Sequence, residues 1–215
     1  FFVSFLPLKE VIKSRTKEFN KKEVYSYSMP LVIVMISIVL MYSMDIILAK
    51  RFFSAELAGQ YAVASMLGKM IFFGTIPISK AMFPLASENS GRKKKDGKVL
   101  SRSLVLVGGI CLIAMLLFFL SPQIIVKILF GAQYLRISGL LIYTGVAFSL
   151  LSISNVIMLY KISRGEFKKA YLLLFFVLIE FILLVVFNKN LEAFSAALVF
   201  SNLLMLIGSI ILIRK

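Results

Sequence analysis

The sequence predicts an all-α membrane protein, a six-transmembrane-helix bundle, and three observations lead to that prediction. The chain of 215 residues is 60% hydrophobic, with a mean hydropathy of +0.95, whereas ordinary soluble domains are roughly 45–50% apolar. Six apolar stretches have about the 20 residues needed to cross a hydrocarbon core of roughly 30 Å. Basic residues are concentrated in alternate gaps between these stretches. Lipid, rather than water, is therefore the expected main solvent.

The apolar stretches divide the chain into two parts. Residues 1–28 are expected to be the end of a truncated upstream helix, which is the apolar octet 1–8, followed by a basic cytoplasmic linker. Residues 29–215 are expected to form the six-helix lobe. Its helices are predicted at residues 29–49, 57–84, 104–120, 137–160, 171–187 and 194–213.

Two local features modify this simple pattern. Pro77 follows Gly74 inside the second helix, and proline predicts a kink or a break because it lacks a backbone N–H. Between the third and fourth helices, residues 122–136 are too short and too polar to span. We expect this segment to lie along the outer interface with four apolar side chains facing lipid, namely Ile124, Ile125, Ile128 and Leu129.

The fourth helix carries a stripe of small and polar residues. Gly145, Ser149, Ser152 and Asn155 fall along one side at about 100° per residue. Close helix packing explains such a stripe, because small residues let helix backbones approach. The lining of a polar cavity is the alternative.

The positions of the basic residues predict the orientation. Of the 25 Lys and Arg residues, eighteen lie in the N-terminal segment, in the gaps after helices two and four, and at the C-terminus. Five lie in the remaining gaps, and Lys69 and Lys80 lie inside the second helix. The excess of bases marks the cytoplasmic side. We therefore expect a multi-pass protein of the cell membrane with both ends of this chain in the cytoplasm.

Several functional classes are disfavoured by composition. A net charge of +15 and a pI near 10.0 are typical of nucleic-acid binding, but the basic-loop bias of membrane proteins explains them better, so no nucleic-acid partner is expected. The chain contains no histidine and a single cysteine, Cys111, and no cluster of acids has metal-ligand spacing. We expect no metal, no cofactor and no enzymatic activity.

Charged residues inside the membrane are the candidate functional residues. Each costs about +2.5 to +3.5 kcal/mol at a helix centre, and such groups usually face the bundle interior or a water-filled cavity. Glu180 lies in the middle of the fifth helix at a depth similar to that of Lys69. A buried Lys69–Glu180 bridge that fixes packing is one expectation.

Asp45 and Lys80 each have two interpretations. Asp45 lies about one turn from Lys50 and Arg51, so it either pairs with them at the interface or serves as an ion- or proton-coupling carboxylate. Lys80 follows Lys69 by about three turns, which would put both ammonium groups in one basic lane on an unbroken helix. Alternatively, Lys80 extends to the cytoplasmic headgroups.

Two stretches of the chain, residues 45–88 and 122–134, resemble a known family. The resemblance is carried by residues 45–49 (DIILA), 52–53 (FF), 58–65 (AGQYAVAS), 67–69 (LGK), 72–73 (FF), 77–78 (PI), 82–88 (MFPLASE), 122–126 (PQIIV), 129–131 (LFG) and Tyr134. These segments are similar to the start of a lobe in oligosaccharide flippases, the polysaccharide-transporter branch of the multidrug/oligosaccharidyl-lipid/polysaccharide exporter superfamily. The resemblance covers the first four helices, and the last two helices match in hydropathy alone.

The resemblance implies a two-lobe, alternating-access transporter in the cell membrane. This chain would be one lobe, equivalent to the C-terminal one, and its partner would be the missing N-terminal lobe of the same protein. The implied substrate is a polyprenyl-pyrophosphate-linked oligosaccharide, moved from the inner to the outer leaflet for cell-surface polysaccharide assembly, with membrane lipids as the surroundings. The implied cavity residues are Lys69, Lys80 and Asn155, with Lys69 best placed to meet a phosphate. Asp45 and Glu180 are the candidates for ion coupling.

Three other functions stay open at this point. A drug or cation extruder of the same superfamily would share the fold, although an acidic cavity would suit its substrates better than Lys69 and Lys80. A polytopic polyprenyl-lipid-modifying enzyme would need clustered carboxylates, and the cytoplasmic gaps hold only Glu88, Asp96 and Glu166. The chain could also be a folding unit or a dimerising half with no activity of its own.

Overall fold

A computed structural model describes residues 21–91, 97–165 and 171–213. Within these ranges the chain forms helices joined by short connections: α2 (Lys21–Phe52), α3 (Ala55–Gly91), α4 (Gly97–Leu120), α5 (Pro122–Phe130), the 3-10 helix η1 (Ala132–Ile137), α6 (Leu140–Ser163), α7 (Leu172–Val186) and α8 (Leu191–Ile213). Each predicted apolar stretch coincides over most of its length with one helix, namely α2, α3, α4, α6, α7 or α8. The protein is therefore an all-α membrane protein, as its sequence predicts.

Five of the described helices are long and apolar enough to cross a membrane. Their apolar parts are Leu31–Phe52, Ala55–Glu88, Gly97–Leu120, Leu140–Ser163 and Leu191–Ile211. The apolar part of α7, Leu173–Val186, is shorter. At about 1.5 Å per residue a helix of that length falls short of the hydrocarbon core, so α7 depends on its neighbours α2 and α8 for its place in the bundle.

Several helices are longer than predicted, α2 and α3 by the most. α2 begins at Lys21 rather than at Met29, and α3 continues to Gly91. Of the predicted kink or break in the second helix, the break is wrong, because α3 is one continuous helix with Pro77 and Pro84 inside it. A proline removes one backbone hydrogen bond, and the contacts of α3 with α2, α4 and α6 hold the helix on both sides of that point.

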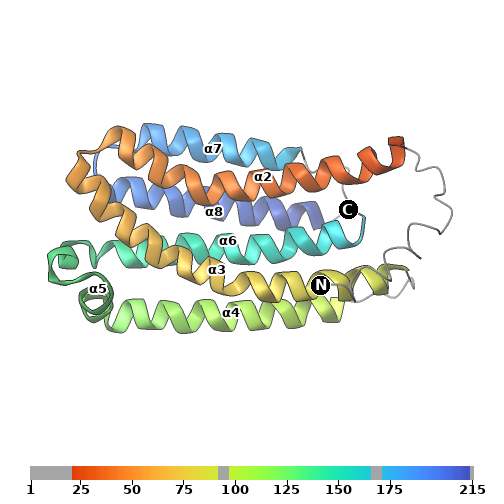
Figure 1. Ribbon diagram of the computed structural model, residues 1–215, viewed down its shortest axis with the longest axis horizontal. Coiled ribbons are helices and arrows are strands. Elements are labelled where there is room, and N and C mark those ends of the chain that lie inside the picture. Colours follow the sequence, from red (N-terminus) through yellow and green to blue (C-terminus); the bar gives the residue numbers. More distant parts are fainter. Residues whose placement is uncertain (1–20, 92–96, 166–170, 214–215) are drawn as a thin grey trace, which may run out of the picture.

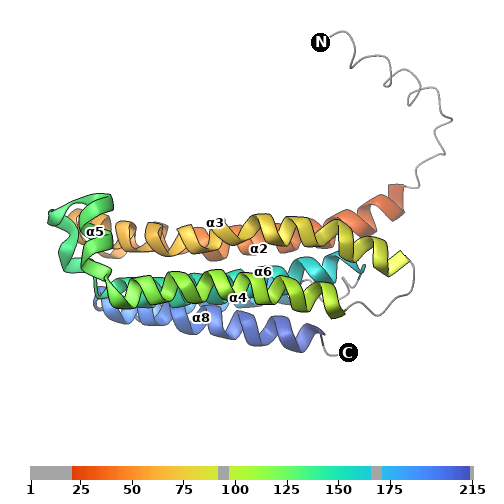
Figure 2. The same cartoon turned by 90° about the horizontal axis from the view of Figure 1, so that it is seen from below.

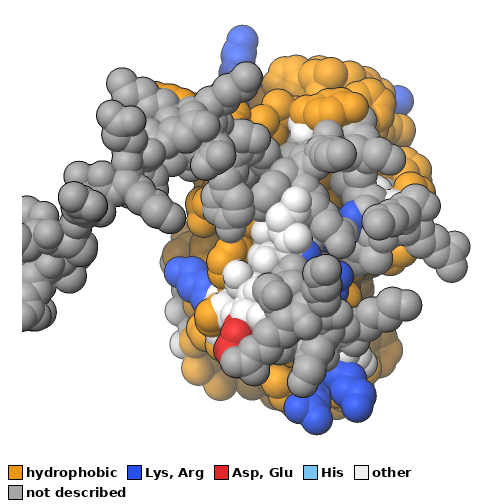
Figure 3. Space-filling view, turned by 90° about the vertical axis from the view of Figure 1, so that its right-hand side faces the viewer, with side chains coloured by type: hydrophobic (Ala, Val, Ile, Leu, Met, Phe, Trp, Pro, Cys, Tyr) orange, Lys and Arg blue, Asp and Glu red, His pale blue; other side chains and the backbone are white. Residues whose placement is uncertain are grey.

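The helices run along one common direction and their connections gather at two ends. Figure 1 shows the α2–α3 turn, α5 and the α7–α8 turn at one end, and the last turns of α3, α6 and α8 with the first turns of α4 and α7 at the other. Figure 2 shows α2 and α3 in one layer, with α4 and α6 beneath them and α8 on the far side. Viewed from the C-terminal end, apolar side chains surround much of the outline, and Lys and Arg side chains lie mainly near its edge (Figure 3).

Helix α6 is the centre of the bundle. It packs on α3, α4 and α8, and 72% of its spanning window is buried, against 22% for the peripheral α4. Small residues allow α3 to approach α6 closely. A Cβ atom added to Gly68 would lie 2.8 Å from the carbonyl oxygen of Thr144. Thr144 in turn donates its hydroxyl hydrogen to the carbonyl oxygen of Ala64 at 3.0 Å, so a side-chain hydrogen bond also joins the two helices.

Residue chemistry at the connections explains where the helices begin. The backbone N–H of Leu57 donates to the hydroxyl of Ser54 at 3.4 Å, and the backbone N–H of Ala193 donates to the side-chain oxygen of Asn190 at 2.7 Å. Both are capping bonds that satisfy otherwise unpaired N–H groups at a helix start. Gly131 separates α5 from η1 with φ +96°, a backbone conformation that favours glycine.

Helix α5 is amphipathic, as predicted for the segment between the third and fourth spans. Ile124, Ile128 and Leu129 are exposed, and Val126 is fully buried. The prediction for Ile125 is wrong: this side chain is half-buried and packs against the core cluster that contains Val126. The apolar face is therefore narrower than the sequence suggested, because α5 uses part of it to attach to the bundle.

Candidate functional site

A fully buried carboxylate on α2 is the centre of the most polar contact set in the bundle. Asp45 has no exposed surface. Its Oδ1 atom lies 2.9 Å from the Nζ atom of Lys69, an ion pair. Its Oδ2 atom accepts hydrogen bonds from the hydroxyl of Tyr61, at 3.2 Å, and from the hydroxyl of Ser65. Three donors therefore surround this carboxylate, which is what a buried ionised group requires.

All three donors come from one face of α3. Tyr61, Ser65 and Lys69 follow one another at intervals of four residues, and side chains at that spacing lie above one another on a helix. Tyr61 and Ser65 were not among the predicted site residues. The signal was present, because two hydroxyl groups and an ammonium group at a four-residue spacing form a row of donors.

Lys69 is held from two sides. Its side chain is 10% exposed, and its Nζ atom lies 5.4 Å from the ring centroid of Phe148 on α6. A cation over an aromatic face is attracted by the ring quadrupole, and the effect is larger where water is excluded. The ammonium group of Lys69 therefore links α3 to both α2 and α6.

The sequence-based pairings of these groups are wrong. Asp45 binds Lys69, and not Lys50 and Arg51, because it is fully buried and points into the bundle. Lys69 makes no ion pair with Glu180 within the described part of the chain. The direction in which each side chain points was not predictable from the sequence.

Glu180 is the second buried carboxyl group. It lies on α7 with no exposed surface, and neither of its oxygen atoms has a hydrogen-bond partner among the described residues. Asp45 and Lys69 are nonetheless within electrostatic reach of it, as is Tyr61. The two acids and the one base thus form a cluster contributed by α2, α3 and α7.

The other predicted cavity residues do not join this cluster. Lys80 is exposed, whereas Lys69 is buried against Asp45, so the two ammonium groups lie in different surroundings. Asn155 is buried between α6 and α3, where its Nδ2 atom donates to the hydroxyl of Ser79 at 3.4 Å. The structure therefore places Lys69, Lys80 and Asn155 in three different surroundings.

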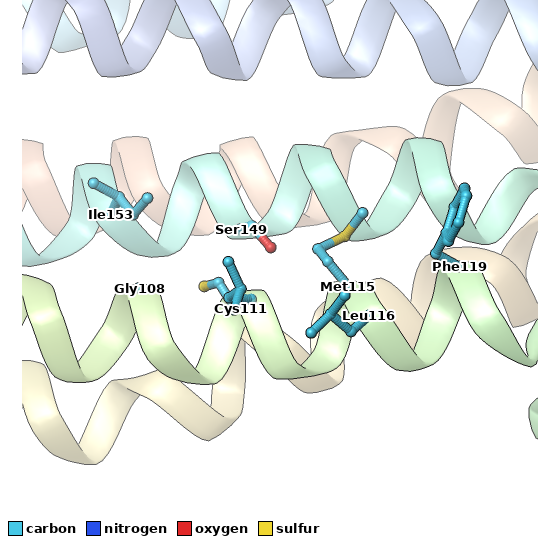
Figure 4. Close-up of a pocket in the computed structure, with 8 residues that line it drawn as sticks. Gly108, Cys111, Met115, Leu116, Phe119, Ser149 and Ile153 are labelled. Atoms are coloured by element: carbon cyan, nitrogen blue, oxygen red, sulfur yellow. The ribbon is translucent and has the colours of Figure 1, made fainter.

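The small-residue stripe of the fourth predicted span faces α4 over part of its length. A Cβ atom on Gly145 would lie 2.7 Å from the sulfur atom of Met115, which fits the close-packing interpretation. Beside it is an open groove of about 460 Å³ between α4 and α6. Figure 4 shows Ser149 and Ile153 on one side of the groove and Cys111 and Met115 on the other. Its lining is almost entirely apolar, so it is no polar cavity.

No metal centre is formed by the described residues. In residues 21–91, 97–165 and 171–213, no group of three or more His, Cys, Asp or Glu side chains is placed to hold an ion. The chemistry that this part of the molecule offers is ionic and hydrogen-bonding.

Comparison with known families decides the assignment. The family model described as polysaccharide biosynthesis protein matches residues 1–139, which is more than half of the chain. The chain belongs to this family. The part that matches contains Asp45, Tyr61, Ser65 and Lys69, whereas Glu180 lies beyond it. No curated protein and no solved structure gives a significant match.

Membership in the polysaccharide biosynthesis family agrees with the resemblance found in the sequence. Together with the long apolar helices, it identifies a multi-pass membrane protein related to polysaccharide production. The family match ends just before α6. The buried ion pair therefore lies in the region that carries the family signal.

Proposed function

We propose that this protein is a flippase. It moves polyprenyl-pyrophosphate-linked oligosaccharides from the inner to the outer leaflet of the cell membrane, where they are used for cell-surface polysaccharide assembly. The chain acts as one six-helix lobe of an alternating-access transporter and works with a second lobe. The observation that carries the proposal is the family match over residues 1–139 in a chain of membrane-spanning helices with a buried ion pair.

The chemistry of the substrate explains why buried cations matter. Moving a sugar head and a pyrophosphate across lipid breaks no covalent bond, so no catalytic residue is needed. The cost is electrostatic, because an anion loses its hydration in a low-dielectric medium. A lysine ammonium on the path replaces part of that hydration with a charge-assisted hydrogen bond.

The structure suggests an order for the two lysines. Lys80 is exposed and is available for a first contact with phosphate. Lys69 is bound by Asp45 and becomes available only when α2 and α3 move relative to each other. Asp45 then acts as a gate: it occupies the ammonium group until the substrate or a helix movement displaces it.

The membrane potential supplies part of the driving force. A pyrophosphate diester carries about two negative charges, and each gains roughly 2.3 kcal/mol per 100 mV when it moves outward across an inside-negative membrane. This bias favours export without any ion gradient.

Translocation of a lipid-linked oligosaccharide by the full-length protein in membrane vesicles tests the proposal. We expect Lys69→Ala to abolish translocation with membrane insertion intact, because the charge that meets the phosphate is removed. Lys69→Arg should retain part of the rate. Lys189→Ala, an exposed lysine in the α7–α8 turn, is the matched control and should transport normally. Normal transport by both Lys69 variants would overturn the role of this ammonium group, and no transport by the wild-type protein would overturn the proposed function.

A further inference from the structure

The buried cluster of Asp45, Lys69 and Glu180 contains two acids but only one base. Asp45 and Lys69 neutralise each other across 2.9 Å. Glu180 is the third ionisable group of the cluster, and no described residue donates a hydrogen bond to it. An ionised carboxylate in that position would be a net charge inside the bundle without compensation, which proteins avoid.

The surroundings of Glu180 offer no second base. Helix α2 packs against α7. The groups that interact electrostatically with Glu180 are Asp45 on α2 and Lys69 and Tyr61 on α3. Helix α8 also packs against α7, and it carries a buried amide, Asn202, whose Oδ1 atom has no hydrogen-bond partner among the described residues. Glu180 on α7 and Asn202 on α8 thus both have oxygen atoms that accept no hydrogen bond from any described residue.

We propose that Glu180 binds one proton and that the cluster of Asp45, Lys69 and Glu180 is a proton-binding site. One proton makes the cluster neutral, and it converts a carboxylate that has no donor into a carboxylic acid that can itself donate. A proton fits this site better than a metal ion, because hard cations take about six oxygen ligands and no group of three acids is present among the described residues.

The arrangement of helices gives the proton a place in transport. Proton binding follows from the geometry of this cluster, whereas its use in transport rests on the proposed function. Lys69 lies within electrostatic reach of both acids. When the proton leaves Glu180, the resulting carboxylate competes with Asp45 for the ammonium group. Release of the proton therefore loosens the link between α2 and α3, which is the link that the proposed transport cycle must open.

Infrared difference spectroscopy of the purified full-length protein tests proton binding without any transport assay. We expect the carbonyl band of a protonated carboxylic acid at neutral pH, and we expect Glu180→Gln to remove it. Glu192→Gln, which changes an exposed acid at the start of α8, is the matched control and should leave the band unchanged. A band unaffected by Glu180→Gln, or one that disappears on addition of sodium ions at constant pH, would overturn the proposal.

Two further variants test the charge count directly. In Asp45→Asn, Lys69 has no other acid to neutralise, so Glu180 should ionise and the acid band should vanish although Glu180 is unchanged. In Lys69→Met, both acids lack a base, so the band should approximately double. A band that responds to neither variant would show that Glu180 is independent of the ion pair. These spectra are recorded on protein at rest, so a flippase assay without transport would overturn the proposed function and leave this result standing.

Discussion

The Asp45–Lys69 ion pair is the strongest single-residue constraint in the bundle. Both groups are buried, and the carboxylate is surrounded by donors. Removing one partner of such a pair costs about 3–5 kcal/mol, because the group left behind loses its ion pair and must find another partner or change its protonation state, whereas removing both is often close to neutral.

We therefore expect Asp45→Asn and Lys69→Met to lower the apparent melting temperature in detergent, each by much more than the double variant does. The quantity to measure is the coupling between the two substitutions in a double-mutant cycle. Melting temperatures that fall by the sum of the single effects would contradict a direct interaction between these groups. The cycle separates stability from translocation, which all three variants are expected to lose.

At this scale the sequence predicted which charged residues lie inside the bundle, but not how they pair. Asp45, Lys69 and Glu180 were recognisable because a charge inside an apolar helix needs a reason. Their pairing was not, because hydropathy gives depth along a helix and carries little information on which neighbouring helix a side chain faces. Tyr61 and Ser65 are common helix residues, and only their four-residue spacing from Lys69 indicated a shared face.

At the scale of elements, the contact between α3 and α6 depends on one glycine. A Cβ atom on Gly68 would lie 2.6 Å from a ring carbon of Phe148 and 2.8 Å from the backbone oxygen of Thr144. The ring can turn, but the backbone oxygen belongs to the central helix and cannot move without shifting α6. This close approach also positions Phe148 against Lys69.

We expect Gly68→Ala to destabilise the protein by about 1–3 kcal/mol, the usual cost of overpacking a filled core. Gly59→Ala on the same helix is the control, because a Cβ atom there meets nothing within 4 Å. That change should be neutral or stabilising by up to about 1 kcal/mol, since alanine is the better helix former. Thermal denaturation of both variants in detergent compares them, and a Gly68→Ala protein as stable as Gly59→Ala would show that the helices are not in such close contact.

Element positions were predictable from length and hydropathy, whereas element ends were not. A spanning helix of about 20 apolar residues is recognisable without neighbours. The extension of α2 back to Lys21 and of α3 to Gly91 runs through polar residues that hydropathy assigns to loops. The continuity of α3 at Pro77 likewise depends on packing with three other helices, which the local sequence does not contain.

In the whole molecule, the helices begin and end at two opposite ends of the bundle. The last turns of α3, α6 and α8 lie at one end, and the turns that follow α2 and α7 lie at the other (Figure 1). This arrangement agrees with an even number of crossings between the ends, with the short α7 counted as one of them. Lys98 lies in the first turn of α4 at the first end, and Lys189 lies in the turn at the second. The positive-inside rule predicts the first end to be cytoplasmic.

Accessibility of two single cysteines in intact cells tests this threading, on which every role assigned to a buried charge depends. The background is a variant in which the native cysteines, Cys111 among them, are replaced by alanine, and Lys98→Cys and Lys189→Cys are introduced separately. A membrane-impermeant maleimide should label Lys189→Cys in intact cells and Lys98→Cys only after the cells are permeabilised. Labelling of both positions from the same side would contradict the account.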